Sequence, residues 1–427
     1  MRYNNPMNHY HLTGIGGVGM RALAQALLDR GYRVSGSDRQ LDSGDSAETF
    51  AILRGQGVML TPQDGSGVSA GQSGLIVSTA IEPDNPEFIR AKELGVPVVH
   101  RAQALADLAA GYELIAVAGT CGKSSVTAIL GWILEGAGFN PAVVNGAGII
   151  GWEANGTRIS SVRKGERYLV AEVDESDKSL TVFSPAHAII TNASADHFGL
   201  AETQTLFDAF KAKVSGHLID ARSGTLCETI PGGFRYEGIE YVVPLPGLHN
   251  IHNAFNAVRM ACALGADPMK IRTALAAFRG IERRLQKTGT CSGADVYDDY
   301  AHNPEKLAAA WRTLQEAYPR GVCGLWRPHG FGPLRKMMDD LTAMFRAVLR
   351  PCDRLILVPV YDAGGTADRS VNTDVLLKRL DLPNVFYFET PAEAETCMKT
   401  HAAKFGALAL FGARDPDLPR FARRLAR

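Results

Sequence analysis

Two glycine-containing segments of this 427-residue chain have the residue types and spacing that bind phosphate groups. One of them is Gly119-Thr120-Cys121-Gly122-Lys123-Ser124-Ser125. In such a loop, backbone N–H groups surround the phosphates of ATP, the lysine neutralises their oxygens, and the serine hydroxyl binds Mg2+. The general pattern has a glycine where this chain has Val117, so this is a variant P-loop. We predict binding of ATP and Mg2+ here, against the alternative of a chance Gly-Lys-Ser turn.

The other segment is Gly14-Ile15-Gly16-Gly17-Val18-Gly19, between an expected strand at His9–Thr13 and an expected helix at Met20–Arg30. Glycines here let the backbone turn tightly and approach a diphosphate, which the helix N-terminus helps to hold. A further strand ends at Ser37-Asp38, where a carboxylate can reach a ribose hydroxyl group. We predict a nucleotide-diphosphate site, with glycines that serve only helix–strand packing as the alternative. Taken alone, this unit suggests NAD.

Acidic side chains follow an apolar strand expected at Tyr168–Ala171, and these are Glu172, Asp174, Glu175 and Asp177. Because residues two apart in a strand share a face, one pair of acids can face the P-loop and bind a phosphate-linked Mg2+. A solvated acidic loop is the alternative. Another expected strand, Ala188–Thr191, leads to Asp196-His197. His197 is either a second metal ligand or a cap for the local backbone.

The elements that must position these residues follow an alternating pattern. Short β-branched runs alternate with amphipathic helical runs, which predicts an α/β fold with parallel sheets. The pattern restarts near Leu114 and again near Asp295, so we expect three domains at residues 1–108, 109–284 and 285–427. Helical periodicity after the P-loop places that loop at a helix N-terminus.

The composition argues against several classes of protein. Lys+Arg and Asp+Glu both number 45, so no basic balance points to nucleic acid as a partner. The first residues lack the apolar core of a signal peptide, and no apolar run reaches the roughly 18 residues that cross a membrane. The seven cysteines lack CxxC spacing, which argues against a disulfide framework or structural zinc. We expect a cytoplasmic protein, and the sequence leaves monomer and homodimer open.

Further motifs occur in an order and spacing that are specific in combination. They are Ser35-Gly36-Ser37-Asp38, Ser78-Thr79-Ala80-Ile81, Asp84-Asn85-Pro86-Glu87, Asn145-Gly146, Glu172-Val173-Asp174-Glu175-Ser176-Asp177, Thr191-Asn192, Asp196-His197, Pro246-Gly247-Leu248-His249-Asn250 with Asn253, Arg283-Arg284, Asp298-Asp299-Tyr300-Ala301-His302-Asn303-Pro304 and Arg327-Pro328-His329. With the two glycine loops they cover nearly the whole chain. On these residues the chain resembles the Mur ligases, most closely the branch that adds alanine to UDP-N-acetylmuramate.

The resemblance implies an ATP-dependent enzyme that forms an amide bond through an acyl-phosphate during synthesis of peptidoglycan precursors for the cell wall. It implies a Rossmann-like N-terminal domain that binds a UDP-linked sugar carboxylate. A central P-loop ATPase-type domain would bind ATP and Mg2+. A Rossmann-like C-terminal domain would bind the incoming amine, which is an amino acid or a peptide.

The resemblance also assigns roles to single residues of this chain. The implied catalytic residues are Lys123, Glu172, His197 and Arg284, and the implied Mg2+ ligands are Ser124, Glu172 and His197. Contacts to ATP are implied for the P-loop and for Asn250, Asn253, Arg284 and Asp299. Contacts to the UDP substrate are implied for Gly14, Gly16, Gly17, Gly19, Ser37, Asp38 and Ser78. The implied amine region contains His302, Asn303, Arg327 and His329.

Several positions depart from the alanine-adding branch. Cys121 stands where that P-loop usually has His, Asn or Ser, and we assign it a packing role. His302-Asn303-Pro304 has one histidine before proline instead of two, and Gly330 replaces an arginine after Pro-His. Phe411–Asp415 replaces a glycine-rich motif. The stretch Ser215–Pro246 is shorter than in the family, so we expect the central domain to lack a small sheet.

The sequence leaves the amine and part of the metal site open. In other Mur branches a lysine near position 211 is carbamylated and helps to bind Mg2+. We hypothesise the same for Lys211, against an ordinary lysine on a helix surface. Other activities consistent with the motifs are the addition of a recycled peptide and ligation to a carboxylate outside the cell wall.

Two readings from other classes remain. The first glycine loop alone fits a nicotinamide-dependent oxidoreductase, but the P-loop, the acidic strand end and Arg284 have no role there. The second alternative is a catalytically inactive homologue that binds nucleotide. The presence of Lys123, Glu172, His197 and Arg284 argues against it.

Overall fold

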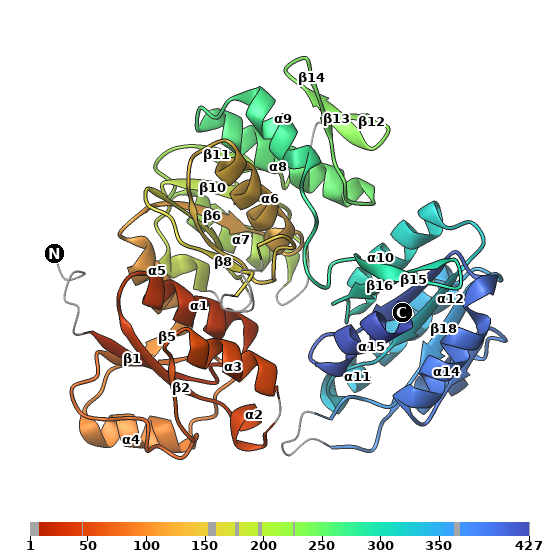
Figure 1. Cartoon of the computed structure of the whole chain (residues 1–427), viewed down its shortest axis with the longest axis horizontal. Helices are drawn as coiled ribbons and strands as arrows, with labels where there is room; N and C mark the ends of the chain where they lie inside the picture. The colour runs from red at the N-terminus through yellow and green to blue at the C-terminus, as the bar shows by residue number, and fades with distance from the viewer. Residues whose placement is uncertain are drawn as a thin grey trace. The chain divides into compact units, whose positions relative to one another are not determined.

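The computed structural model describes residues 8–44, 46–152, 159–175, 179–194, 199–224, 227–362 and 368–426. The chain forms two compact units, Met1–Arg279 and Gly280–Arg427. The predicted α/β class is confirmed, since three sheets consist mainly of parallel strands joined through helices (Figure 1). The three domain boundaries drawn from the sequence stay predictions.

The first unit begins with a five-stranded parallel sheet in the order β3-β2-β1-β4-β5. Its strands are β1 (His9–Thr13), β2 (Arg33–Ser37), β3 (Met59–Leu60), β4 (Gly74–Val77) and β5 (Val98–His100). Its helices are α1 (Val18–Asp29), α2 (Arg39–Asp42), α3 (Ala47–Gly55), α4 (Pro86–Leu94) and α5 (Arg101–Ala109). Leu12 on β1 and Leu23 on α1 are buried in one core. The central strand β1 therefore carries the first glycine loop to the middle of the sheet's carboxyl edge.

A second sheet in the same unit has the order β11-β10-β6-β9-β7-β8, with only β8 antiparallel to its neighbour. Its strands are β6 (Glu113–Ala118), β7 (Ala142–Val144), β8 (Val162–Arg163), β9 (Tyr168–Glu172), β10 (His187–Ile190) and β11 (Leu218–Asp220). The accompanying helices are α6 (Lys123–Gly136), η1 (Ser179–Val182), α7 (Leu200–Lys211), α8 (Leu248–Ala263) and α9 (Pro268–Ala276). Residues 115–118 of β6 are fully buried, as expected for a continuous apolar strand covered on both faces.

The expectation that the central domain lacks a small sheet is wrong. A three-stranded antiparallel sheet, β12 (Glu228–Ile230), β13 (Gly233–Tyr236) and β14 (Ile239–Val242), lies beside α8 and α9 (Figure 1). Two-residue turns join its strands, and Glu237 and Gly238 both have positive φ, as tight hairpins require. Phe234 stacks on Tyr241 with ring centroids 5.2 Å apart, and its edge meets Phe255 of α8. Short turns, not loss of the sheet, explain the short sequence.

The second unit is built on a six-stranded sheet in the order β15-β16-β20-β17-β18-β19, in which only the β15–β16 pair is antiparallel. Its strands are β15 (Gln286–Cys291), β16 (Ala294–Asp299), β17 (Val322–Trp326), β18 (Arg354–Leu357), β19 (Val385–Tyr387) and β20 (Ala407–Phe411). Its helices are α10 (Pro304–Ala317), α11 (Phe331–Lys336), α12 (Met338–Val348), α13 (Thr373–Leu380), α14 (Pro391–His401), η2 (Ala402–Lys404) and α15 (Asp417–Leu425). Trp311 and Trp326 are completely buried in its core.

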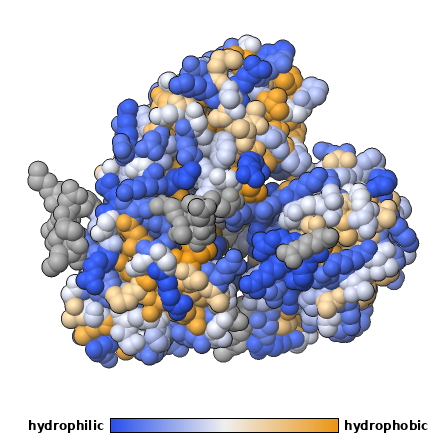
Figure 2. All heavy atoms as spheres, viewed as in Figure 1, coloured by the Kyte–Doolittle hydropathy of each residue, from blue (hydrophilic) through white to orange (hydrophobic). Residues whose placement is uncertain are grey.

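Hydrophilic side chains prevail on the face seen in Figure 2, between smaller hydrophobic areas. Within the residues that the structure describes, no helix is long and apolar enough to span a bilayer.

Candidate active site

The P-loop leaves the carboxyl end of β6 and leads into α6, as predicted. Gly119 and Gly122 have φ values of 133° and 85°, in the region that favours glycine. A Cβ atom at Gly119 would lie 2.0 Å from Thr191 Oγ1, and one at Gly122 would lie 2.6 Å from Asn253 Oδ1. Both glycines are therefore required by backbone conformation and by close neighbours. Lys123 begins α6, so the loop's N–H groups lie at the helix N-terminus, where phosphate binds well.

Asn192, just after β10, holds the P-loop in shape. Its Oδ1 accepts hydrogen bonds from Thr120 Oγ1 at 2.7 Å and from Cys121 N at 2.9 Å. Its Nδ2 donates to Cys121 O at 3.0 Å, and Thr191 Oγ1 donates to the same oxygen at 2.6 Å. The sequence motif Thr191-Asn192 gave no hint of this role. The signal needed was the strand order, because β10 pairs directly with β6.

Lys123 is surrounded by oxygen atoms. Its Nζ donates to Gly119 O at 2.7 Å and to Glu175 Oε2 at 2.7 Å, and it lies 3.5 Å from Asp174 Oδ1. Burial alone would lower the pKa of Lys123, but attraction to the nearby carboxylates, Glu175 first, outweighs it and raises the pKa. Lys123 is therefore a cation held over the P-loop, as a group that binds phosphate must be.

Ser124 and Glu172 form a second contact at the same edge. Ser124 Oγ donates to Glu172 Oε2 at 2.8 Å, and Gly146 N donates to the same oxygen at 2.9 Å. Glu172 ends β9, which is the neighbour of β6. A hydroxyl and a carboxylate oxygen beside a P-loop are the donors that Mg2+ prefers. No group of three or more His, Cys, Asp or Glu suited to a metal occurs among the described residues, so this pair would need further ligands.

Asn250 and Asn253, the two asparagines predicted to contact ATP, lie in the first two turns of α8. Asn253 Oδ1 approaches Gly122, as described above, so α8 brings an amide side chain against the P-loop. Asn250 Nδ2 donates to Pro246 O at 2.7 Å and so braces the segment that leads into the helix. Both side chains are buried. The geometry brings Asn253, but not Asn250, into contact with the P-loop.

The first glycine loop is closed by Asp38. Gly16 N donates to Asp38 Oδ2 at 2.9 Å, and Gln40 N donates to Asp38 Oδ1 at 2.9 Å. Gly14 N donates to Ser37 O at 2.8 Å. The carboxylate predicted to meet a ribose hydroxyl thus already organises the loop, and burial raises its pKa. Ser78 follows β4, next to β1 in the same sheet.

In the second unit, Arg283 and Arg284 have different environments. Arg283 Nη1 donates to Ala413 O at 2.6 Å, and its Nε lies 3.2 Å from Asp298 Oδ2. The guanidinium of Arg284 lies 5.7 Å from the ring centroid of Tyr300. Both guanidinium groups lie near the Tyr300 ring, with Arg283 at 5.1 Å, but Arg283 is in addition tied into its own unit by hydrogen bonds and an ion pair.

Asp299, predicted to contact ATP, is a buried carboxylate used by the backbone. Leu285 N donates to its Oδ2 at 2.6 Å, and Ala301 N donates to its Oδ1 at 2.7 Å. Burial raises its pKa, while Arg284 opposes this shift. The geometry supports a structural role for Asp299, which fixes the backbone next to Arg284.

The residues predicted for the amine region gather where β16 and β17 end. The rings of His302 and His329 lie 5.3 Å apart, and Asn303 caps α10 by accepting from Lys306 N. Arg327 Nη1 donates to the buried Asp415 Oδ2 at 2.5 Å. His302, His329 and Arg327 therefore share the carboxyl edge of the sheet, the usual ligand-binding edge of parallel sheets.

Comparisons with known proteins agree with this geometry. Family models match three segments, described as "Mur ligase family, catalytic domain" over residues 9–113, "Mur ligase middle domain" over 117–217 and "Mur ligase, glutamate ligase domain" over 283–414. The chain is 32% identical to the UDP-N-acetylmuramate–L-alanine ligase of Nitrobacter winogradskyi, over 88% of this chain and 87% of that protein. The chain belongs to the Mur ligase family. The corresponding ligase of Methylocella silvestris is 31% identical over 100% of this chain and 94% of that protein.

Solved structures show the same fold. The UDP-N-acetylmuramate-alanine ligase of Thermotoga maritima matches with a TM-score of 0.80 and 24% identity over 98% of both chains. A murein peptide ligase of Psychrobacter arcticus matches with a TM-score of 0.67 and 19% identity, again over 98% of both chains. The predicted three-part Mur ligase architecture is thereby confirmed.

Two of the predicted metal ligands, His197 and carbamylated Lys211, have no support from the described residues. The described residues do not include His197, and they also do not include Asp196 and Asp177. Lys211 ends α7, is about half exposed, and its Nζ lies 3.3 Å from Asp220 Oδ2. That ion pair favours a free ammonium group over an anionic carbamate. Carbamylation of Lys211 stays a prediction, and full activity of Lys211→Ala irrespective of bicarbonate would contradict it.

The environment of His329 makes the stability of the fold depend on pH. Burial first, then repulsion from His302 and Arg414, lowers its pKa to about 4. The unfolded chain, with a histidine pKa near 6.5, therefore binds a proton between pH 6.5 and 4 that the folded state excludes. The contribution of neutral His329 to the free energy of unfolding is therefore fully present above pH 6.5 and is lost as the pH falls from 6.5 to 4.

His329→Gln should reduce the loss of stability between pH 7 and 4.5 by on the order of 1 kcal/mol, a value kept small because the ring is partly exposed. Thermal unfolding of both proteins across a pH series measures this. An identical pH dependence in the two proteins would show that His329 does not titrate as described.

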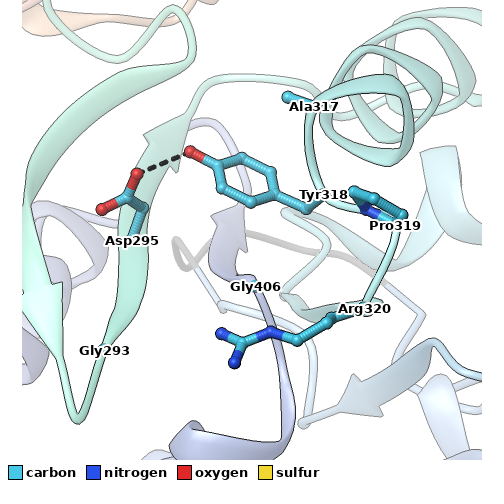
Figure 3. Close-up of a pocket in the computed structure, with 7 residues that line it drawn as sticks. All are labelled: Gly293, Asp295, Ala317, Tyr318, Pro319, Arg320 and Gly406. Atoms are coloured by element: carbon cyan, nitrogen blue, oxygen red, sulfur yellow. Dashed lines mark hydrogen bonds between the residues drawn. The ribbon is translucent and has the colours of Figure 1, made fainter.

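The second unit also contains a cavity at the opposite edge of its sheet. Figure 3 shows Tyr318 pointing toward Asp295, and Tyr318 OH donates to Asp295 Oδ2 at 2.6 Å. The cavity is about 180 Å³, whereas ligand pockets usually measure roughly 300 to 1,000 Å³. It lies where β16 and β20 begin, so it is separate from the edge that carries His302 and His329.

Proposed function

We propose that this chain is an ATP-dependent, ADP-forming ligase that joins L-alanine to the carboxylate of UDP-N-acetylmuramate in peptidoglycan precursor synthesis. The observation that carries the proposal is the P-loop at the carboxyl edge of the second sheet, with Ser124 in contact with Glu172 at the end of the neighbouring strand and Lys123 in contact with Glu175 just beyond it. The choice of substrates rests on relatives named for those substrates, which align over most of the chain.

Each phosphate-binding group has a defined task in this proposal. Lys123 neutralises the terminal phosphates of ATP, which lets an anionic carboxylate approach them. Ser124 and Glu172 would hold Mg2+, together with His197. The metal, when bound, supplies further neutralisation of the phosphate oxygens. Asn192 keeps the P-loop in the shape that surrounds those phosphates, and Asn253 lies against the loop at Gly122.

The proposed reaction proceeds in two steps. A carboxylate oxygen of UDP-N-acetylmuramate forms a bond to the γ-phosphorus of ATP, and the bond to ADP breaks. The amine nitrogen then bonds to the acyl carbon, loses a proton, and inorganic phosphate leaves with the former carboxylate oxygen. Exclusion of water protects the acyl-phosphate from hydrolysis.

The other sites follow the same family pattern. The Gly14–Gly19 loop, with Ser37, Asp38 and Ser78, would bind the UDP part of the acceptor. Arg284 would contact phosphate, and Asp299 would act by fixing the chain around it. His302, Asn303, Arg327 and His329 would border the amine.

The test is release of inorganic phosphate from ATP and Mg2+ in the presence of UDP-N-acetylmuramate, screened against single amino acids and short muropeptides. Release that requires both UDP-N-acetylmuramate and L-alanine supports the proposal. A requirement for a peptide in place of alanine would move the assignment to peptide addition. Absence of release with every amine, on protein that binds ATP, would contradict UDP-N-acetylmuramate as the acceptor.

A further inference from the structure

Glu175 lies beside the P-loop but forms no hydrogen bond with Ser124 or Glu172, the pair of described residues proposed to bind the metal. The side chain of Glu175 is 2% exposed, against 36% for Asp174. Its Oε2 accepts from Lys123 Nζ at 2.7 Å, a charge-assisted hydrogen bond. Glu172 Oε2, in contrast, accepts from Ser124 and Gly146 N. The two acids therefore have different partners: Glu172, the last residue of β9, contacts the serine, and Glu175, after the strand, contacts the lysine.

Because the ion pair between Lys123 and Glu175 is largely buried, the loss of either partner should destabilise the fold. Lys123 is 12% exposed and Glu175 is 2% exposed, so water and salt screen their attraction poorly. Removal of one partner from a buried pair leaves the other charge uncompensated, which is strongly destabilising. Asp174 lies 3.5 Å from Lys123 Nζ and is more exposed, so its influence is weaker. Lys123 therefore has one close, buried anionic partner among the described residues.

The pair also fixes the direction of the lysine side chain. A lysine stem has several rotatable bonds, and its freedom is costly to restrict in each binding event. Here Gly119 O and Glu175 Oε2 accept two of the three ammonium protons and hold Nζ over the loop. The next carboxylate oxygen, Asp174 Oδ1, is more distant at 3.5 Å, so a phosphate oxygen can compete for the third proton. We propose that Glu175 is a positioning residue, which acts through Lys123 to orient that ammonium group toward the terminal phosphate of ATP.

This inference rests on the proposed function for its nucleotide part, so we choose two measurements. The first is the affinity for a non-hydrolysable ATP analogue and for ADP, both with Mg2+, measured by calorimetry. Glu175→Gln keeps the shape of the side chain but removes its charge. It should reduce the preference for the triphosphate over the diphosphate by about tenfold. Asp174→Asn should reduce it less.

A matched control is Glu228→Gln, which removes an exposed glutamate paired with Arg235 in the same unit. It should leave the ratio of the two affinities unchanged. Equal weakening of ADP and the ATP analogue by Glu175→Gln would indicate a general distortion of the P-loop and would overturn the inference. An effect of Asp174→Asn as large as that of Glu175→Gln would also overturn it.

The second measurement requires no nucleotide. Lys123→Ala leaves Glu175 buried without its cation, so thermal unfolding should occur at a lower temperature than in the unmodified protein. Adding Glu175→Gln to Lys123→Ala should raise the unfolding temperature again. A further fall in the double variant would overturn the pairing. If the unmodified protein fails to bind nucleotide but this cycle behaves as expected, the proposed function fails while the ion pair stands.

Discussion

Replacement of Lys123 by alanine is expected to lower kcat for phosphate release by at least about a thousandfold. Attack of a carboxylate on the γ-phosphate brings two anions together, and Lys123 is the cation held over the P-loop by Gly119 O and Glu175. The loss should appear mainly in kcat, because charge on the transferring phosphoryl group is stabilised most in the transition state. Steady-state phosphate release at saturating substrates measures it.

The control for this substitution is Lys399→Ala, which removes an exposed lysine paired with Glu395 on α14. It should change kcat less than about twofold, since exposed ion pairs contribute little. Circular dichroism should show that both variants are folded. Retention of more than a tenth of the original kcat by Lys123→Ala would contradict the role given to the P-loop lysine.

Replacement of Glu172 by glutamine is expected to raise the Mg2+ concentration needed for half-maximal activity by at least about tenfold. The substitution removes a negative charge from the proposed metal site. It also places an amide near two hydrogen-bond donors, Ser124 Oγ and Gly146 N, which now both contact Glu172 Oε2. A titration of activity against Mg2+ at fixed ATP measures the shift.

Glu113→Gln is the matched control, because Glu113 is a partly exposed glutamate at the opposite end of β6, paired with Arg167. It should leave the Mg2+ dependence unchanged. If Glu172→Gln shows the same Mg2+ dependence as the unmodified protein, Glu172 does not bind the metal. A rate that falls without any change in Mg2+ dependence would point instead to a role for Glu172 in fixing Ser124.

The local patterns of the sequence predicted the P-loop and its surroundings well. The apolar run Leu114–Ala118, glycines at positions 119 and 122, and helical periodicity after Lys123 all lie within a few residues of one another. Each feature depends on local backbone geometry, so it can be recognised without knowledge of the rest of the fold. The same holds for β1, the first glycine loop and α1, which the structure confirms as strand, loop and helix.

Features that depend on distant segments could not be predicted. Asn192 braces the P-loop only because β10 lies next to β6, a strand order that the sequence does not reveal. Alternation along a strand suggested that acids two residues apart share a face. Glu172 and Asp174 both lie beside the P-loop, at Ser124 and 3.5 Å from Lys123. The closest acidic partner of Lys123 is nevertheless Glu175, which follows the strand on irregular backbone. The small sheet was missed because chain length was taken as evidence, whereas tight turns allow three strands in few residues.

The measurement that tests the central claim most directly is oxygen transfer from the acceptor to phosphate. UDP-N-acetylmuramate labelled with 18O in its carboxylate is incubated with ATP, Mg2+, L-alanine and the protein. The released inorganic phosphate is then analysed by mass spectrometry. Formation of an acyl-phosphate predicts that each phosphate released carries one oxygen from the labelled carboxylate. Phosphate released without the label would contradict the acyl-phosphate route and, with it, the ligase assignment.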